Sequence, residues 1–310
     1  MTAAKQLHTL ATTVSTNEAA SPDKQLIEAY STTSDQQASQ SASAVVNPDD
    51  PPWGVGQALV VWVTSVVLLF FMPLVTSLPY ILYKVVVVGS TQGLSTDPNL
   101  IFYTVLGVLP AHVLTFLIVW LLVTKRGQRP FWQTLGWSWS KTFGPWKTIG
   151  LAVLLLGVGV LLTQFLGGKE TQLDQVIGSS LKTRFATAIL AVATAPMVEE
   201  LTFRGVLYPA LQRTLGMLWA VVLVSTLFAG VHLLQYFDNF GVVAVIIMLS
   251  VSLTLLRART GRLLPSFVLH LVFNAIQAVV LGVQPFVGKS HTENRAAVGF
   301  LIRSLLRFFA

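Results

Sequence analysis

The chain has 310 residues, of which 53% are hydrophobic and only 11% are charged. Average soluble domains carry roughly 25% charged residues, so this composition excludes a soluble globular protein and indicates an integral membrane protein. A formal net charge of +7 can indicate nucleic-acid binding, but in so apolar a chain we attribute it to basic loops at an anionic membrane surface, and we expect no nucleic-acid partner. The absence of cysteine excludes disulfides, a cysteine nucleophile, thiolate metal ligands and cysteine lipidation.

Residues 1–52 form a polar N-terminal segment that we predict to be disordered. The segment is rich in Ser, Thr, Gln and Ala and has no sustained apolar period. It lacks the apolar stretch of a signal peptide. A run of Asn, Pro and Asp at positions 47–52 marks its end. The sequence assigns this segment no role.

Residues 53–294 are predicted to form an all-α, polytopic membrane helix bundle of about seven or eight transmembrane helices. The prediction rests on successive apolar stretches, each near the roughly 20 residues that a helix needs to cross a bilayer. The stretches are 57–79, 101–123, 148–166, 185–207, 216–235, 240–256 and 263–284. Residues 295–310 are too few to span a membrane, and Arg alternates there with apolar residues, which is typical of an amphipathic interfacial helix.

Basic residues are concentrated in alternate loops of the predicted bundle. They lie mainly in loops 124–147, 208–215 and 257–262. Because Lys and Arg are enriched in cytoplasmic loops, we expect these three loops and the N-terminus to be cytoplasmic. The chain is thus expected to be a multi-pass membrane protein in contact with lipid, and to lie in the plasma membrane if its source is bacterial.

Charged residues inside an apolar span require an explanation, because a charge at bilayer depth costs roughly 3 kcal/mol on insertion scales. The fourth predicted span contains Glu199, Glu200 and Arg204. Glu200 and Arg204 are four residues apart, so we expect them to pair on one helix face. Glu199 lies about 100° around the helix and has no local cation. This position makes Glu199 a candidate general acid or base.

Two later spans supply polar partners: His232 lies in the fifth, and His270 and Asn274 share one face of the seventh. A Glu and a His could activate a water molecule, and a His and an Asn could donate hydrogen bonds to a developing oxyanion. Together these groups are sufficient for direct hydrolysis of a peptide bond by water. A single buried His is often only a helix–helix hydrogen bond, and we favour that reading for His112 in the second span.

Three short motifs, in this order on three apolar spans, resemble those of the CAAX protease and bacteriocin-processing family, also called the CPBP or Abi family. The motifs are Glu199-Glu200-x-x-x-Arg204, Phe228-x-x-x-His232 and His270-x-x-x-Asn274. The resemblance covers roughly residues 185–284 and implies an all-helical, metal-independent intramembrane glutamic endopeptidase without a cofactor.

The resemblance also implies roles for the motif residues. Glu199 would be the catalytic base, and His232 would share the activation of water. His270 and Asn274 would form the oxyanion hole, and Glu200 and Arg204 would support the site. The implied substrate is a protein cleaved near its C-terminus, prenylated where it is a CAAX protein, or else a small peptide.

Other functions are compatible with parts of this pattern. A non-catalytic scaffold or a bacteriocin-immunity protein of the same family could keep every motif residue. A transporter could use Glu199, His232 and His270 as a proton relay, although the sequence has none of the inverted repeats typical of transporters. A zinc site from the two histidines and one Glu is chemically feasible, but the chain lacks a His-Glu-x-x-His motif.

Overall fold

The computed structural model describes residues 47–287. Every regular element within these residues is a helix, which confirms the predicted all-α fold. The predicted disorder of residues 1–46 and the predicted interfacial helix at 295–310 lie outside the described residues. Residues 47–52, the end of the predicted polar segment, lie inside them and make defined contacts with the bundle.

The first half of the bundle consists of long helices joined by short helical turns. It comprises α2 (Val55–Leu82), the π-helix η1 (Tyr83–Val88), the one-turn helix η2 (Leu94–Thr96), α3 (Pro98–Leu106), α4 (Val108–Thr124), α5 (Phe131–Thr134), α6 (Pro145–Leu166) and α7 (Gln172–Ser179). The second half contains the segment with the three motifs. It comprises α8 (Leu181–Ala193), α9 (Ala195–Glu199), the π-helix η3 (Glu200–Leu207), α10 (Tyr208–Tyr236), α11 (Phe240–Thr260) and α12 (Leu263–Val287).

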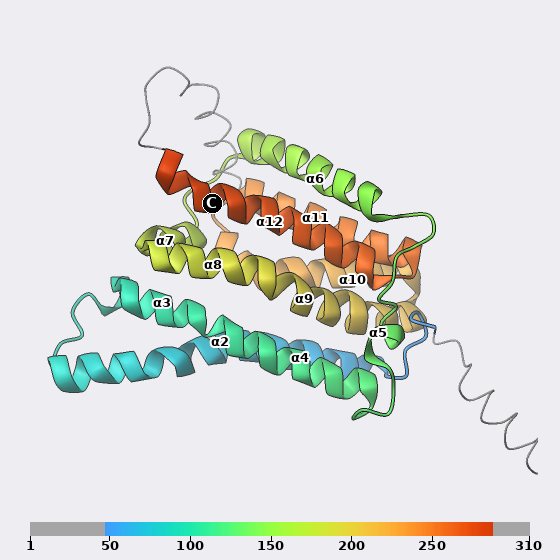
Figure 1. Ribbon diagram of the computed structural model, residues 1–310, viewed down its shortest axis with the longest axis horizontal. Helices are drawn as coiled ribbons and strands as arrows, with labels where there is room; N and C mark the ends of the chain where they lie inside the picture. The colour runs from blue at the N-terminus through green and yellow to red at the C-terminus, as the bar shows by residue number, and fades with distance from the viewer. Residues whose placement is uncertain (1–46, 288–310) are drawn as a thin grey trace, which may run out of the picture. The chain divides into compact units, whose positions relative to one another are not determined.

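The motif helices lie in the middle of the bundle. Helix α6 packs against α11 and α12 on one side, and α2 packs against α3, α4 and η3 on the other. The helices from α8 to α12 lie between α6 on one side and α2 and α4 on the other, as Figure 1 shows. The motif residues are therefore held among helices rather than on a surface that faces lipid.

Six helices are long and apolar enough to cross a membrane, counted over residues 47–287. One of them, Leu181–Tyr236, has 56 residues and contains the two predicted spans 185–207 and 216–235. At about 1.5 Å per residue it is far too long for one crossing of a core roughly 30 Å thick. Its backbone breaks at Gly216, whose φ of 79° and ψ of 167° suit glycine alone. The six helices therefore agree with the seven predicted spans.

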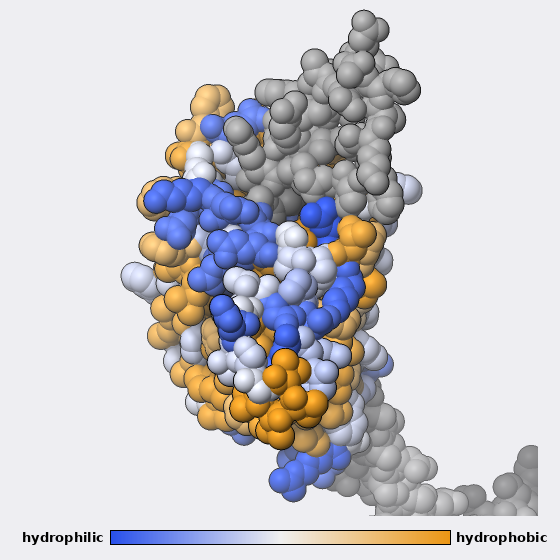
Figure 2. Space-filling view, turned by 90° about the vertical axis from the view of Figure 1, so that its left-hand side faces the viewer, coloured by the Kyte–Doolittle hydropathy of each residue, from blue (hydrophilic) through white to orange (hydrophobic). Residues whose placement is uncertain are grey.

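The outer surface of the bundle differs from that of a water-soluble protein. Large apolar side chains point outward; Leu74, Phe165 and Leu218 are 64%, 84% and 68% exposed. The charged residues Glu200 and Arg204 are fully buried. Figure 2 shows polar side chains gathered over the end of the bundle that carries α7 and the start of α3, with apolar side chains around it. Lipid-facing sides and water-facing ends account for this pattern.

The three loops that we predict to be cytoplasmic meet at one end of the bundle. Arg213 pairs with Asp50 at 3.1 Å, and the buried Arg257 pairs with Asp49 at 2.6 Å. The backbone N–H of Leu263 donates to the carbonyl of Gly136, so loop 124–147 joins the same contact. The three basic loops thus lie at the same end of the bundle, as predicted. That this end faces the cytoplasm stays a prediction.

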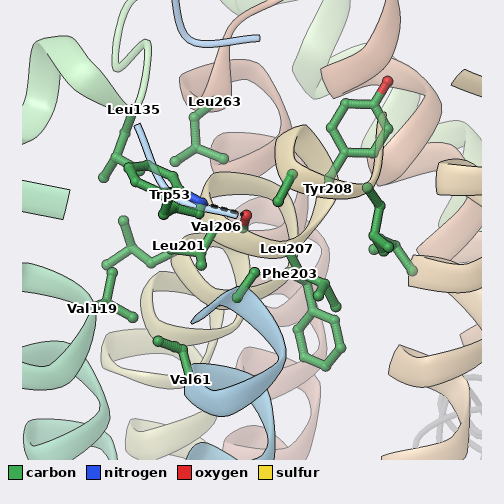
Figure 3. Close-up of a cluster of buried hydrophobic side chains, with 14 of the residues drawn as sticks. Trp53, Val61, Val119, Leu135, Leu201, Phe203, Val206, Leu207, Tyr208 and Leu263 are labelled. Carbon is green, nitrogen blue, oxygen red and sulfur yellow. Dashed lines mark hydrogen bonds between the residues drawn. The ribbon is translucent and has the colours of Figure 1, made fainter. Parts of the chain in front are cut away.

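Trp53 connects this end of the chain to the motif segment. Its ring is buried beside Leu135, Leu201 and Val206, as Figure 3 shows. Its indole Nε1–H donates to the carbonyl of Val206 at 3.0 Å. Val206 belongs to η3, which begins with Glu200. The segment just before α2 therefore helps to hold the helix that carries the first motif.

Replacing Trp53 with Phe should lower the free energy of unfolding by about 1–3 kcal/mol, because the ring is largely kept while the buried carbonyl of Val206 loses its donor. Thermal unfolding in detergent measures the change. The matched control is Trp146→Phe, since Trp146 is 83% exposed on the outside of the bundle. Equal stability of the two variants would contradict the role assigned to the indole N–H.

Asp97 organises the opposite end of the bundle. Its carboxylate accepts hydrogen bonds from the backbone N–H of Asn99 and from the hydroxyl of Tyr80, both at 2.9 Å. It also pairs with the Lys84 ammonium at 3.0 Å. The hydrogen bond from Lys84 is the main reason that the pKa of Asp97 is lowered from 3.8 to about 2.

Because the folded pKa lies below the unfolded one, Asp97 should stabilise the fold fully above pH 4 and lose this effect as the pH falls towards 2. The stability difference between the wild type and Asp97→Asn should therefore be present at pH 7 and shrink towards pH 2. Unfolding in detergent across this pH range measures it. Asp238→Asn, which changes an exposed carboxylate at the same end, serves as the control. A pH-independent difference would refute the assignment.

Candidate active site

The first motif begins just after a break between two helices. Helix α8 ends at Ala193, and Thr194 has non-helical angles of φ −122° and ψ −41°. Pro196 follows in the first turn of α9. Proline has no N–H to donate and clashes with the carbonyl one turn earlier, so a continuous helix is disfavoured here. Because of this break, the short helix α9 runs in its own direction. It ends at Glu199.

The rest of the first motif lies in a π-helix. All eight residues of η3, from Glu200 to Leu207, are buried. Short π-helical segments inside α-helices are frequent at functional sites. Pro209, the second residue of α10, lies just after η3 and lacks the N–H that a regular helix would need at that point. Glu200 and Arg204, which the sequence analysis placed on one face, remain neighbours in this geometry.

Glu200 and Arg204 form a fully buried ion pair with an N–O distance of 3.0 Å. Three further hydrogen bonds of Arg204 go to α11. Its Nε donates to the hydroxyl of Thr254 at 3.2 Å, and its second terminal nitrogen donates to the hydroxyl and the carbonyl of Ser250 at 2.8 and 3.1 Å. A buried charge that keeps its partner and most of its hydrogen bonds can persist in an apolar interior.

His270 lies between the two glutamates of the first motif. Its Nδ1–H donates to Oε1 of Glu200 at 3.1 Å, since a carboxylate oxygen can only accept. Its Nε2 lies 3.7 Å from Oε2 of Glu199, beyond hydrogen-bonding distance. Glu199 is the more open of the two carboxylates, with a side chain 22% exposed against 0% for Glu200. The two adjacent glutamates therefore have different environments.

Asn274 lies one helical turn beyond His270 on α12. Its amide nitrogen donates to the carbonyl of Ala191 at 2.9 Å, near the end of α8. A side-chain amide has two N–H donors, so this bond uses one of them. The predicted pair His270 and Asn274 thus faces the first motif, with His270 at its glutamates and Asn274 at the helix that precedes them.

His232 reaches the same region from α10. Its Nδ1–H donates to the carbonyl of Phe228 at 2.9 Å, so in the neutral ring Nε2 is the acceptor. The ring stacks on Phe228, with centroids 4.6 Å apart. No hydrogen bond or ion pair joins His232 to Glu199 within the described part of the chain.

Phe228 joins all three motifs, although it was not among the predicted site residues. Its ring contacts His232 and lies edge-on to His270, with 6.0 Å between the ring centroids. The Arg204 guanidinium lies over the same ring, 4.6 Å from its centre. Its place four residues before His232 was the available signal.

Ser250 and Thr254 were also missed, and their spacing of four in an otherwise apolar span pointed to one polar helix face.

The structure also shows where the other candidates lie. His112 binds Thr194 at 2.8 Å, which is the predicted helix–helix hydrogen bond. Among residues 47–287 there is no group of three or more His, Asp or Glu side chains arranged to hold a metal ion.

Residues 181–276 match the protein-family model described as "Type II CAAX prenyl endopeptidase Rce1-like". The predicted family resemblance is therefore confirmed over these residues. No curated protein and no solved structure matches the chain significantly. The matched segment includes α8 to α11 and most of α12, so it holds all three motifs. The chain is therefore a multi-pass membrane protein whose residues 181–276 are similar to this family.

Proposed function

We propose that the protein is a glutamate-dependent intramembrane endopeptidase that hydrolyses a peptide bond near the C-terminus of a prenylated CAAX protein or of a small peptide. The observation that carries the proposal is the pair of unlike glutamates. Glu200 is fully buried against Arg204 and His270, while Glu199 is partly open beside the same His270. A fixed charge next to a more accessible carboxylate is an arrangement suited to acid–base catalysis.

In this proposal, Glu199 and His232 hold the attacking water. Both the carboxylate and Nε2 of His232 are hydrogen-bond acceptors, because Nδ1–H of His232 is directed to the carbonyl of Phe228. A water between them would donate one hydrogen to each and turn a lone pair towards the substrate. Glu199 would take a proton as the water oxygen bonds to the scissile carbonyl carbon.

His270 and Asn274 would stabilise the oxyanion that forms. Asn274 retains a second N–H beyond the one bonded to Ala191. His270 already donates Nδ1–H to Glu200, so donation from Nε2 requires that both ring nitrogens carry a proton. Collapse of the intermediate would then break the carbon–nitrogen bond, and the proton held by Glu199 would pass to the departing amine. Glu200 and Arg204 would keep His270 in place.

A direct test uses the purified full-length chain, a farnesylated CAAX peptide and water enriched in ¹⁸O. The expected result is release of the last three residues, with one ¹⁸O atom in the new carboxyl terminus of the farnesylated fragment. The same peptide without the farnesyl group shows whether the lipid is required. In parallel, new peptide termini in membranes that contain the wild type or Glu199→Ala would reveal a small-peptide substrate.

The rival function is a non-catalytic scaffold or immunity protein that keeps the same residues. Under that function, folded wild-type protein would release no tripeptide, and the termini found in membranes would be the same with the wild type and with Glu199→Ala. That pair of results would overturn the protease proposal.

A further inference from the structure

The break between α8 and α9 determines where Glu199 lies. Thr194 is the one non-helical residue between the two helices, and Glu199 follows five residues later at the end of α9. Because α9 is so short, a small change of direction at Thr194 would carry the Glu199 carboxylate away from His270. The position of the predicted base therefore depends on what fixes this break.

Two side chains from other helices bind at the break. From α12, Asn274 donates to the carbonyl of Ala191 at 2.9 Å. From α4, the Nδ1 atom of His112 lies 2.8 Å from the hydroxyl oxygen of Thr194. The same hydroxyl donates its single hydrogen to the carbonyl of Leu190 at 3.2 Å. With its hydrogen placed on Leu190, the hydroxyl accepts from Nδ1–H of His112, and this is the tautomer that we assign to the ring.

His112 is well placed to hold the break. Its side chain is buried, at 7% exposure, and α4 packs against both α9 and η3. His112 lies outside the three motifs and outside the matched residues 181–276. Its contact with Thr194 therefore ties a helix from another part of the bundle to the segment that carries the motifs.

We propose that His112 is a positioning residue for Glu199, and that it acts by donating a hydrogen bond to Thr194 at the start of α9. The proposal rests on the function assigned above, in which Glu199 is the catalytic base. It predicts that the contribution of His112 depends on the N–H at Nδ1 and not on the basicity of the ring.

The first experiment compares His112→Ala, His112→Asn and Thr194→Val in the peptide-release assay. His112→Ala and Thr194→Val should each lower kcat by roughly 10- to 100-fold with KM unchanged, because misplacement of a catalytic group affects the chemical step. Asn also carries an N–H donor on the atom bonded to Cγ, so His112→Asn should recover most of the activity. Thr148→Val is the matched control, since Thr148 is buried and bonds only to its own helix, α6.

A double variant tests whether the two residues act through one bond. If they do, His112→Ala combined with Thr194→Val should lower kcat no further than either single change. Additive losses would overturn the proposal. So would a His112→Asn variant as slow as His112→Ala, because that result would assign the effect to the imidazole itself.

A second experiment needs no activity. The chain has no cysteine, so Glu199→Cys provides a single thiol at the position in question. His112→Ala should change the rate at which a water-soluble maleimide labels this thiol, His112→Asn should restore the rate, and Thr148→Val should leave it unchanged. If the wild type releases no tripeptide while labelling responds in this way, the proposed function fails and the positioning stands. If the wild type is active but neither kcat nor labelling responds, the positioning is wrong.

Discussion

Replacing Glu199 with Gln should lower the rate of tripeptide release by roughly 10²- to 10⁴-fold, since an amide cannot take a proton from the attacking water. The change is nearly isosteric. Glu199 is partly exposed, and the titratable side chain beside it, His270, lies 3.7 Å away, so little stability should be lost. Peptide release and thermal unfolding, measured on the same detergent-solubilised preparation, would separate these two effects.

The control for this prediction is Glu170→Gln, which removes an exposed carboxylate in the loop between α6 and α7. It should leave peptide release unchanged. If Glu199→Gln kept more than about a tenth of the wild-type rate, Glu199 would contribute less than general-base catalysis ordinarily does, and the proposed mechanism would be wrong.

The pairing of Glu200 with Arg204 and the shared face of His270 and Asn274 could be predicted because helix geometry is local. A spacing of four residues places two side chains together in whichever helix they occur. The transmembrane spans could be predicted for a similar reason, since bilayer thickness alone sets the length of an apolar stretch. Even the merged element from Leu181 to Tyr236 divides at Gly216, where the sequence indicated a new span.

Contacts between distant segments could not be predicted in this way. Trp53 bonds to Val206, 153 residues later, and no local pattern links the two. The contact between His112 and Thr194 is equally non-local. Each residue alone gave a local signal, since His112 is a histidine in an apolar span and Thr194 lies two residues before Pro196. The π-helical form of η3 had only Pro209 as a signal, and that proline fits the start of an ordinary helix equally well.

Removing Arg204 should cause the largest loss of stability among single changes in the site. Arg204→Met keeps much of the side-chain volume but leaves Glu200 as a fully buried carboxylate without its cation. Breaking a buried ion pair from one side typically costs about 3–5 kcal/mol, because the remaining charge stays desolvated and uncompensated. Unfolding in detergent should show a loss of this size, whereas Arg262→Met, which removes an exposed charge, should stay within about 0.5 kcal/mol of the wild type.

The double variant Glu200→Gln with Arg204→Met distinguishes this explanation from a simple loss of packing. With no carboxylate left to bury, the double variant should be more stable than Arg204→Met alone, since replacing both partners of a buried pair is often nearly neutral. It should nevertheless remain a poor enzyme, because the neutral amide in place of Glu200 can still accept Nδ1–H of His270 but supplies no negative charge beside the ring. Recovery of stability without recovery of activity would assign the ion pair two separate roles: Arg204 allows Glu200 to be charged inside the bundle, and the charged Glu200 holds His270 beside Glu199. A double variant no more stable than Arg204→Met would mean that the lost contacts with Ser250, Thr254 and Phe228 explain the whole effect.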